Sequence, residues 1–319
     1  MTGQAGEIHT DVVRADEAGI ARALGLLAAG NVVAIPTETV YGLAADATNA
    51  GAVARIYAAK GRPSFNPLIA HVADADMAAR HVVVPALAFR LMEAFWPGPL
   101  TLVLERRAES PIASLVTAGL ATLAVRCPDH PVPHALIAGL GRPLAAPSAN
   151  RSGGISPTRA AHVALSLAGR IPLVVDGGAC RAGLESTIVA LDGDRLRLLR
   201  PGGVPVEALE TVAPVVHAAR SAGIEAPGML ESHYAPAKPL RLDATEAATG
   251  EFLIGFGDVA GDATLSASGD LVEAAARLFD LLHAADTGPA AAISVAPVPE
   301  RGLGLAINDR LRRAAAPRG

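Results

Sequence analysis

Short apolar runs alternate along this chain with longer segments in which apolar residues recur at helical spacing. Residues 32–35 form one such run, which Pro36 ends, and the helix predicted before it can begin at Asp16 and end at Gly30. A run that is apolar at every position is typical of a strand buried on both faces of its sheet. The alternation therefore predicts a mixed α/β fold with a largely buried sheet.

The same pattern continues through the chain and divides it into two domains. It places helices over 50–59, 85–95, 131–140 and 159–167, and strands over 68–72, 101–104, 120–125, 144–146, 171–175, 187–191 and 196–199. After a stretch with prolines at 214, 227, 236 and 239, strands are predicted over 252–256 and 291–295 and helices over 270–284 and 303–315. A long segment without periodicity is usually a linker or a functional loop. We therefore expect a domain over 1–212, a linker over 213–238 and a small α/β domain over 239–319.

Composition excludes several classes of protein. Hydrophobic residues make up 51% of the chain, charged residues only 18%, and the formal net charge is −4, which rules out a disordered chain and a globally basic nucleic-acid-coating surface. Two cysteines are too few for a disulfide framework, and no Cys/His cluster has the spacing of zinc ligands. Because no signal pattern and no apolar stretch of membrane-spanning length is present, we expect a cytoplasmic protein without a membrane partner.

Five predicted strands end in, or directly adjoin, a polar residue next to Pro, Gly or another polar residue. The junctions are VVAI-PTETVYG (32–42), LAVR-CP (123–128), LAA-PSAN (144–150), ESTIVAL (185–191) and RLLR-PGG (197–203). In open α/β sheets, ligands bind beyond the strand ends, where the loops converge. These junctions therefore predict one shared pocket without identifying its ligand.

Four cations lie at positions that suggest an anion site, two in a loop directly after a predicted helix and two at strand ends. Lys60 and Arg62 lie in the segment KGRPSFNPL, and Lys238 is the only other lysine of the chain. Arg126 and Arg200 each end an apolar strand, which is a costly place for an isolated guanidinium. Each residue alone could equally serve a helix C-terminus or a buried ion pair with a carboxylate. Together they favour a local anion site in an otherwise acidic protein.

A loop rich in hydroxyl groups and backbone donors follows the PSAN motif. Ser148, Asn150 and Ser156 lie in it, and the helix predicted next begins near Arg159. Such a loop can hold phosphate with its backbone N–H groups, whereas an ordinary helix cap would explain only Thr158. The chain has no GxxxxGK[ST] sequence, so a P-loop is excluded.

Seven motifs occur in a fixed order between residues 16 and 212. They are PTETVYGL (36–43), KGRPSFNPL (60–68), WPGPLT (96–101), VRCP (125–128), PSAN (147–150), DGG…EST (176–187) and LLRPG (198–202). Together they resemble the YrdC-like L-threonylcarbamoyladenylate synthases. SHYAP (232–236) and GLGLAINDRLRRAA (302–315) resemble the long, two-domain form of that family. The resemblance implies a YrdC-like twisted mixed sheet with helices around a cationic cavity, plus a small Rossmann-like C-terminal α/β domain.

The resemblance implies a nucleotidyltransferase reaction. L-threonine, bicarbonate or CO2, and ATP would give threonylcarbamoyl-AMP and pyrophosphate. A threonylcarbamoyl transferase complex would then pass the group to a tRNA adenosine, and direct contact with tRNA is left open. Mg²⁺ is expected to arrive with the nucleotide, because no carboxylate cluster marks a metal site built by the protein. A carbamate that attacks an α-phosphate brings two anions together, so clustered cations suit the reaction and no protein nucleophile is needed.

By motif position, the resemblance also implies roles for individual residues. L-threonine would be bound by Thr39, His71, Arg126, the carbonyl of Ala146 and Ser186. ATP would be bound by Arg62, Asn66, Thr122, Ser148, Ser156, Arg200 and Tyr234. Lys60 and Arg62 would be catalytic, with Lys60 neutralising phosphate charge, and Asn150 would support the loop. Tyr234 would reach over the nucleotide, which makes the linker over 213–238 a lid.

Other interpretations of the same residues stay open at this stage. Without the resemblance, His71 would be a core histidine, Thr39 a turn residue, and Tyr234 an aromatic that anchors a linker. An RNA-binding or ribosome-associated module could use the same cationic cavity, although aromatic residues make up only 3% of the chain. A carbamoyl-transfer domain of the hydrogenase-maturation type is a third candidate. It is disfavoured because the zinc-finger and acylphosphatase-like segments of those proteins are absent from this sequence.

Overall fold

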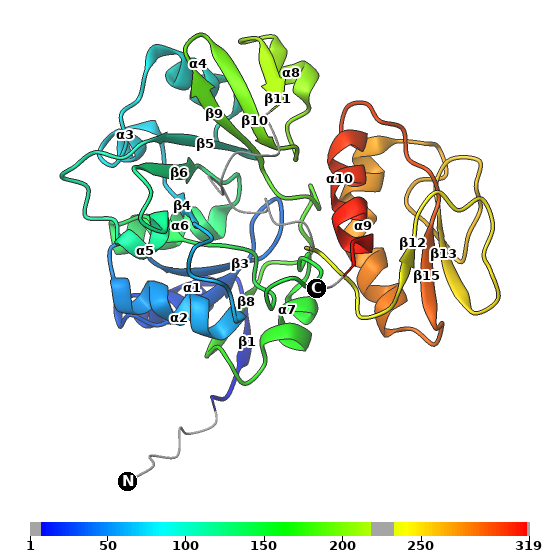
Figure 1. Ribbon diagram of the computed structural model, residues 1–319. Helices are drawn as coiled ribbons and strands as arrows, with labels where there is room; N and C mark the ends of the chain where they lie inside the picture. Colours follow the sequence, from blue (N-terminus) through cyan, green and yellow to red (C-terminus); the bar gives the residue numbers. More distant parts are fainter. Residues whose placement is uncertain (1–7, 218–232, 318–319) are drawn as a thin grey trace.

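The computed structural model describes residues 8–217 and 233–317 (Figure 1). These residues form a large α/β domain around an eleven-stranded sheet and a smaller one around a four-stranded sheet. The predicted linker over 213–238 falls partly on residues 218–232, which lie outside the described residues. No helix of the described ranges is long and apolar enough to cross a membrane.

The large domain contains β1 to β11 and α1 to α8. Its strands are β1 (Asp11–Arg14), β2 (Val33–Ile35), β3 (Gly42–Asp46), β4 (Ile69–His71), β5 (Leu100–Glu105), β6 (Thr122–Arg126), β7 (Leu144–Ala145), β8 (Leu173–Asp176), β9 (Thr187–Asp192), β10 (Arg195–Arg200) and β11 (Val215–His217). Its helices are α1 (Glu17–Ala28), α2 (Ala50–Lys60), α3 (Ala75–Ala79), α4 (Ala86–Phe95), α5 (Ser114–Thr117), α6 (Pro131–Leu140), α7 (Ala160–Leu167) and α8 (Val206–Glu210).

The large sheet is mixed, with the order β1-β8-β2-β3-β7-β4-β6-β5-β9-β10-β11. Strands β4 and β6 run parallel, and their register pairs His71 with Arg126. Strand β7 runs antiparallel to β4, and the PSAN loop follows its end. Segments that are far apart in the sequence therefore meet near the middle of the sheet, as the strand-end junctions predicted.

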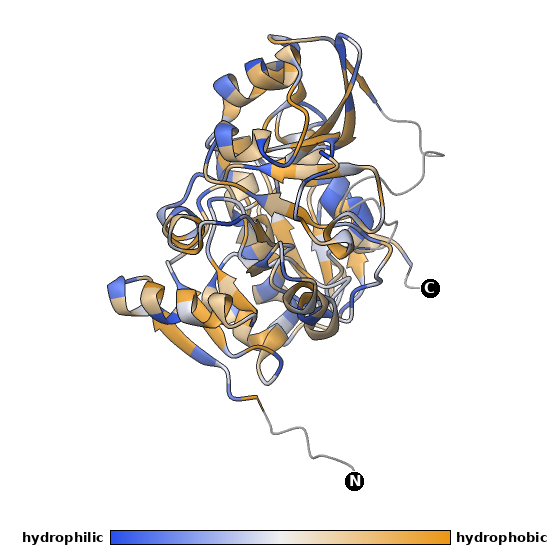
Figure 2. Ribbon diagram, turned by 90° about the vertical axis from the view of Figure 1, so that its left-hand side faces the viewer, coloured by the Kyte–Doolittle hydropathy of each residue, from blue (hydrophilic) through white to orange (hydrophobic). Residues whose placement is uncertain are grey.

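Helices cover both faces of the large sheet. One buried cluster joins the sheet to α2, α4 and α5, and it includes Val53, Ile56 and Leu91. A second cluster joins α1 and α6 to β2 and β8, and it includes Leu27 and Leu136. Figure 2, coloured by hydropathy, shows strands that are mostly apolar and helices that carry hydrophilic residues on one face. Because both faces of these strands are buried, their sequences are apolar at nearly every position.

The elements predicted from the sequence are present with shifts of one to three residues at most of their ends. Helix α1 begins as predicted, because the Asp16 side chain accepts a hydrogen bond from the Gly19 N–H at 2.9 Å. The sequence analysis did not find strand β3, which pairs antiparallel with β2. Its residues, GLAAD, are small and carry none of the β-branched or aromatic side chains that mark a strand. The edge strands β1 and β11 and the short helices α3, α5 and α8 were missed as well.

The smaller domain contains β12 (Leu240–Arg241), β13 (Glu251–Gly255), β14 (Ala263–Thr264), α9 (Leu271–Thr287), β15 (Ala292–Val295) and α10 (Gly304–Ala315). Its sheet, in the order β12-β15-β13-β14, is parallel throughout. The C-terminal α/β domain is therefore confirmed, although the two-residue strands β12 and β14 were not predicted. Figure 1 shows α9 and α10 between this sheet and the large domain.

The two domains are in close contact along α9. The Arg159 Nε atom donates to Asp280 Oδ1 at 2.7 Å, and His283 Nε2 lies 3.1 Å from the Ser156 carbonyl oxygen. Gly183 has a φ of +70°, and a Cβ atom at this position would lie 2.4 Å from the carbonyl oxygen of Ala275 in α9. A glycine is required here both by the backbone conformation and by the approach of the helix.

Gly183→Ala tests how tightly the domains pack. The added Cβ would meet the backbone of α9 in a strained conformation, so the free energy of unfolding should fall by about 3 kcal/mol or more. Gly193→Ala is the matched control, because Gly193 also has a positive φ, +58°, but open space around it. That variant should lose only about 1 kcal/mol. Urea unfolding measures both, and equal losses would contradict the tight contact.

Candidate active site

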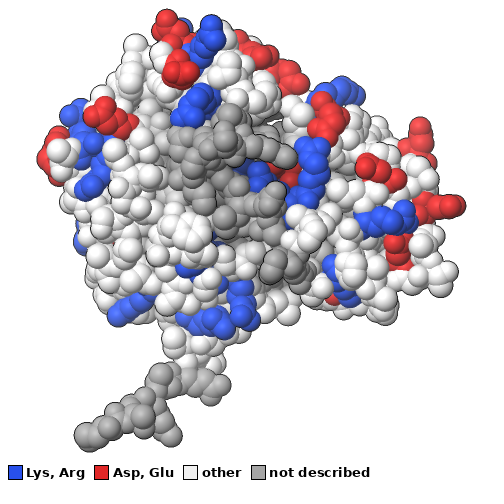
Figure 3. All heavy atoms as spheres, viewed as in Figure 1, with Lys and Arg blue, Asp and Glu red and all other residues white. Residues whose placement is uncertain are grey.

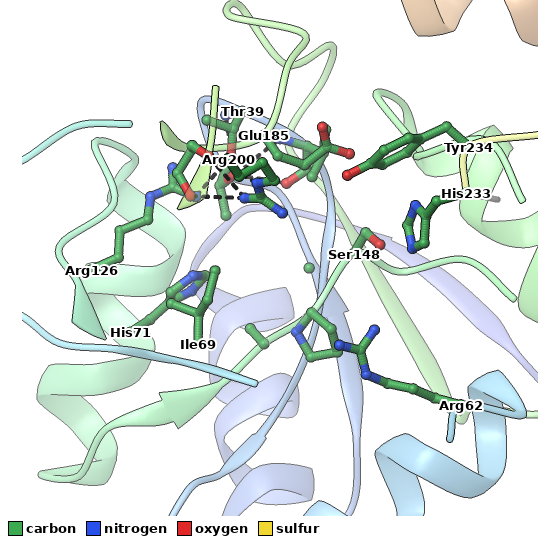
Figure 4. Close-up of a pocket in the computed structure, with 16 residues that line it drawn as sticks. Thr39, Arg62, Ile69, His71, Arg126, Ser148, Glu185, Arg200, His233 and Tyr234 are labelled. Carbon is green, nitrogen blue, oxygen red and sulfur yellow. Dashed lines mark hydrogen bonds between the residues drawn. The ribbon is translucent and has the colours of Figure 1, made fainter. Parts of the chain in front are cut away.

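A pocket opens where the loops of the large sheet meet the start of the C-terminal segment (Figure 4). It is lined by Thr37, Thr39, Val40, Gly42, Arg62, Ile69, His71, Arg126, Ala146, Pro147, Ser148, Glu185, Ser186, Arg200, His233 and Tyr234. Figure 4 shows Arg126 and His71 on one side of this pocket and Arg62, His233 and Tyr234 on the other. Three buried guanidinium groups from distant segments therefore surround one hollow.

Arg126 is fixed at the end of β6 by three groups. Its Nη1 atom donates to the Thr39 hydroxyl at 2.9 Å, and its Nε atom donates to the Gly98 carbonyl at 3.2 Å. Its Nη2 atom lies 2.5 Å from Glu38 Oε1 in an ion pair whose side chains are only 4% and 2% exposed. Arg126 therefore has a fixed orientation, and its charge is balanced by Glu38 before any ligand binds.

Glu38 is a site residue that the sequence analysis missed. It lies in the PTETVYG junction beside Thr39, and its Oε2 atom has no hydrogen-bond partner among the described residues. The signal was an acidic residue inside an apolar strand-end junction, which is an unfavourable place for an unpaired carboxylate. Without the fold, nothing indicated which arginine it pairs with.

His71 faces the same end of the pocket from β4. Burial and then the charge of Arg126 hold the pKa of its imidazole well below the ordinary value, so the ring is neutral. Its Nδ1 atom has no hydrogen-bond partner in the part of the chain that the structure describes. A neutral ring with a free nitrogen can donate or accept a hydrogen bond to a ligand.

Arg62 forms the opposite side, directly after α2. Its Nη2 atom donates to the Pro67 carbonyl at 2.9 Å and its Nε atom to the Asn66 carbonyl at 3.2 Å, so the KGRPSFNPL loop folds back on itself. Burial lowers the pKa of Arg62 to about 10, at which the group is still charged at neutral pH. The Asn66 side chain is buried and has no hydrogen-bond partner within the described ranges.

Lys60 is buried behind the pocket and is not one of its lining residues. Its Nζ atom donates to the carbonyl oxygens of Ser148 and Asn150, at 2.6 and 2.5 Å. Burial and then the neighbouring Arg62 hold the pKa of Lys60 well below its ordinary value. The ammonium therefore lies under the PSAN loop and supports its backbone. Asn150 supports the same loop, because its Nδ2 atom donates to the Gly154 carbonyl at 2.7 Å.

Arg200 lies at the end of β10, between the two sides in the view of Figure 4. Its Nη2 atom donates to the carbonyl of Ser186 at 2.9 Å and to the Ser186 hydroxyl at 3.2 Å. The Ser186 hydroxyl also contacts that of Thr101 at 2.7 Å. Burial lowers the pKa of Arg200.

Tyr234 closes one side of the pocket from the described end of the predicted linker. It is fully buried, has a φ of +64°, and its hydroxyl has no hydrogen-bond partner among the described residues. The next residue, Ala235, donates its N–H to the Gly153 carbonyl at 2.8 Å. The described end of the linker is thus attached to the hydroxyl-rich loop.

Some of the predicted residues do not line the pocket. Ser156 lies behind it and donates to the carboxylate of Glu185, a lining residue that the sequence analysis did not single out. Thr122 begins β6 and pairs with Glu105, whereas Arg126 lies at the other end of that strand. The structure does not bring Thr122 to the pocket.

Comparisons with known proteins show which family the chain resembles. A protein-family model described as "Telomere recombination" matches residues 25–202, and one described as "Threonylcarbamoyl-AMP synthase, C-terminal domain" matches residues 204–316. The threonylcarbamoyl-AMP synthase of Bacillus subtilis is 41% identical, with 97% of this chain and 96% of the relative covered. The enzyme of Pyrococcus abyssi is also 41% identical, with 95% of both chains covered. The crystal structure of Pyrococcus abyssi Sua5 with L-threonine aligns over 97% of both chains with a TM-score of 0.85 and 38% identity.

Glu38→Gln tests whether the ion pair fixes the Arg126 side of the pocket. The substitution leaves a buried guanidinium without its counter-charge, so the free energy of unfolding should fall by about 3 kcal/mol. The control is Glu109→Gln, because Glu109 is exposed, lies 3.6 Å from Arg107, and should change stability little. Urea unfolding of both variants checks this, and a Glu38 variant as stable as the control would contradict it.

Proposed function

The chain belongs to the threonylcarbamoyl-AMP synthase family, and we propose that its pocket holds L-threonine on the Arg126 side and ATP on the Arg62 side. The activity is the nucleotidyl transfer that makes threonylcarbamoyl-AMP, the first step of threonylcarbamoyladenosine modification of tRNA. The observation that carries the two-sided assignment is the meeting of three buried arginines around one pocket. Each guanidinium matches the planar geometry of a carboxylate or phosphate.

We assign the threonine carboxylate to Arg126 and the Thr39 hydroxyl. Arg126 is already oriented by Glu38 and Thr39, so little freedom is lost when the amino acid binds. The free Nδ1 of neutral His71 and the carbonyl of Ala146 would take the amino and hydroxyl groups, and Ser186 would lie beside them. The similarity to a synthase solved with L-threonine supports this side of the assignment.

We assign the nucleotide to Arg62, Ser148, Arg200 and Tyr234. Arg62 and Arg200 would neutralise the phosphates, and Ser148 belongs to the loop that Lys60 supports from behind. Lys60 would not contact the phosphates itself. It would hold in place the loop that contacts them, because its Nζ atom donates to two carbonyl oxygens of that loop. Asn66 does not line the pocket, but its buried amide has no hydrogen-bond partner among the described residues and would join this side once the nucleotide binds. Ser156 and Asn150 would keep the surrounding loop in place.

The reaction then follows from position and charge. The threonine ammonium gives up one proton to water, and the free amine adds to CO2, which bicarbonate supplies by loss of hydroxide. The nitrogen then releases a second proton to water, which leaves the carbamate. One carbamate oxygen attacks the α-phosphorus, and the bond to pyrophosphate breaks. In the view of Figure 4, Arg200 lies between the two sides, where the carbamate and the phosphate would meet. Fixed guanidinium groups at this point stabilise the developing negative charge without reorganising, which is the main contribution expected from the protein.

Mg²⁺ would accompany ATP and help to neutralise the leaving pyrophosphate. Within the described ranges, no group of three or more His, Cys, Asp or Glu residues could hold a metal ion. Of the two acidic side chains nearest the site, Glu38 pairs with Arg126 and Glu185 with Arg310. The ion would therefore be bound by the phosphates rather than by a protein site.

We propose that the product passes to a threonylcarbamoyl transferase complex that modifies tRNA and that the protein acts in the cytoplasm with this partner. The alternative of an RNA-binding module has less support. On the face shown in Figure 3, acidic and basic side chains alternate over the upper and right-hand parts, whereas the lower part of the large domain shows basic side chains without acidic neighbours. The formal net charge of −4 gives the protein no general attraction for a phosphate backbone. We therefore assign no direct tRNA contact.

The direct test is to supply the purified chain with ATP, L-threonine and labelled bicarbonate. We expect threonine-dependent release of pyrophosphate and a labelled acyl-adenylate. Steeply salt-dependent RNA binding without threonine-dependent turnover would favour the RNA-binding alternative instead.

Arg126→Lys tests the division of the pocket. Lysine keeps the charge but loses the planar fork, so the KM for threonine should rise by about tenfold or more while the KM for ATP changes little. Arg62→Lys is the matched variant and should show the opposite pattern. Steady-state kinetics with each substrate varied in turn measures both. Equal effects on the two KM values in either variant would contradict the assignment.

A further inference from the structure

Arg310 of α10 is a fully buried arginine that extends from the small domain to the pocket of the large one. Its Nε atom donates to Glu185 Oε2 at 2.8 Å, across the domain boundary, and its Nη1 atom donates to Asp309 Oδ2 at 2.6 Å. Its guanidinium carbon lies 5.1 Å from the ring centroid of Tyr234. By contrast, Arg312 on the same helix is about half exposed and pairs with Glu300 at the surface.

Glu185 explains why a cation is needed at this position. The carboxylate lines the pocket, and its other oxygen accepts a hydrogen bond from the Ser156 hydroxyl. Burial alone would raise the pKa of Glu185, but Arg310 and then Arg200 more than offset this and lower it, so the group is ionised. Without a cation beside it, the Glu185 carboxylate would repel bound phosphates, and little water would be present in the pocket to screen this repulsion.

Tyr234 depends on the same helix pair. Its positive φ is costly for a non-glycine residue and persists only where the surroundings hold it. The ring packs 5.7 Å from that of Phe279 in α9 and lies under the Arg310 guanidinium. Both contacts come from the small domain, so that domain holds the aromatic side of the pocket in place.

We propose that Arg310 is a positioning residue through which the C-terminal domain completes the nucleotide side of the pocket. It neutralises Glu185 from behind and holds the Tyr234 ring, and it touches no substrate itself. This proposal rests on the assignment of ATP to that side of the pocket. It predicts that the large domain's own residues bind ATP poorly when this one side chain of the small domain is lost.

The proposal separates into a charge effect and a packing effect, which a double-variant experiment distinguishes. Arg310→Met keeps most of the side chain's volume and removes its charge. We expect the KM and the Kd for ATP to rise by about tenfold or more, with the KM for threonine within about twofold of the parent. Arg310→Lys should recover part of the loss, because it restores the charge without the fork.

Glu185→Gln is the second arm. When the Glu185 carboxylate is gone, the pocket lining loses its acidic side chain, and Arg310 keeps its ion pair with Asp309. Glu185→Gln alone should therefore bind ATP at least as tightly as the parent. The double variant should recover most of the affinity that Arg310→Met loses. If Arg310 only joined the domains, the double variant would be as poor as Arg310→Met or worse, and both KM values would rise together. Arg312→Met is the surface control on the same helix and should leave both KM values unchanged.

Isothermal titration with a non-hydrolysable ATP analogue reads the same effect without turnover. An Arg310→Met variant that binds the analogue like the parent would overturn the proposal while leaving the synthase assignment intact. A parent that makes no acyl-adenylate and binds no analogue would instead remove the nucleotide assignment on which the proposal depends. If the Arg310→Met variant does not fold, the Glu185→Gln variant still tests the proposal. Weaker ATP binding in the Glu185→Gln variant would contradict a neutralising role for Arg310.

Discussion

The structure depends on the burial of several positive charges around one hollow. Arg62, Arg126 and Arg200 are each less than a tenth exposed, and a guanidinium out of water is costly unless it is paired or fully hydrogen-bonded. Backbone carbonyls hold Arg62 and Arg200, and a carboxylate holds Arg126. In the proposed assignment, anionic substrates add further compensation, above all at Arg62 and Arg200, and binding energy would come from charges that the fold has already desolvated and oriented.

Two buried ion pairs between a carboxylate and a guanidinium lie beside the pocket. Glu38 pairs with Arg126 inside the large domain, where the guanidinium faces the pocket. Glu185 pairs with Arg310 across the domain boundary, where the carboxylate faces the pocket and the guanidinium stands behind it. In the first pair the acid fixes the orientation of the cation that we assign to the threonine carboxylate. In the second, a cation from the small domain neutralises an acid, which couples the two domains to one site.

The sequence predicted the parts of the fold that rest on local patterns. Apolar runs located β2, β4 and β6, and the strand-end junctions indicated that Arg126 and Arg200 line one pocket. Arg62 follows a helix, and it was grouped with them because clustered cations favour an anion site. Strand β3 was not predicted, because the Gly, Ala and Asp residues that make up most of it have little preference for strands. Glu185 and Arg310 are 125 positions apart, and no local spacing predicts such a pair. The position of Lys60 under the PSAN loop likewise follows from long-range packing and not from its motif.

The most direct measurement is a crystal structure of the chain with L-threonine and a non-hydrolysable ATP analogue bound together. The account predicts one cavity containing both ligands, with the threonine carboxylate on Arg126, the phosphates between Arg62 and Arg200, and the threonine nitrogen directed at the α-phosphate. Threonine and nucleotide in separate cavities, or phosphates on the Arg126 side, would contradict it.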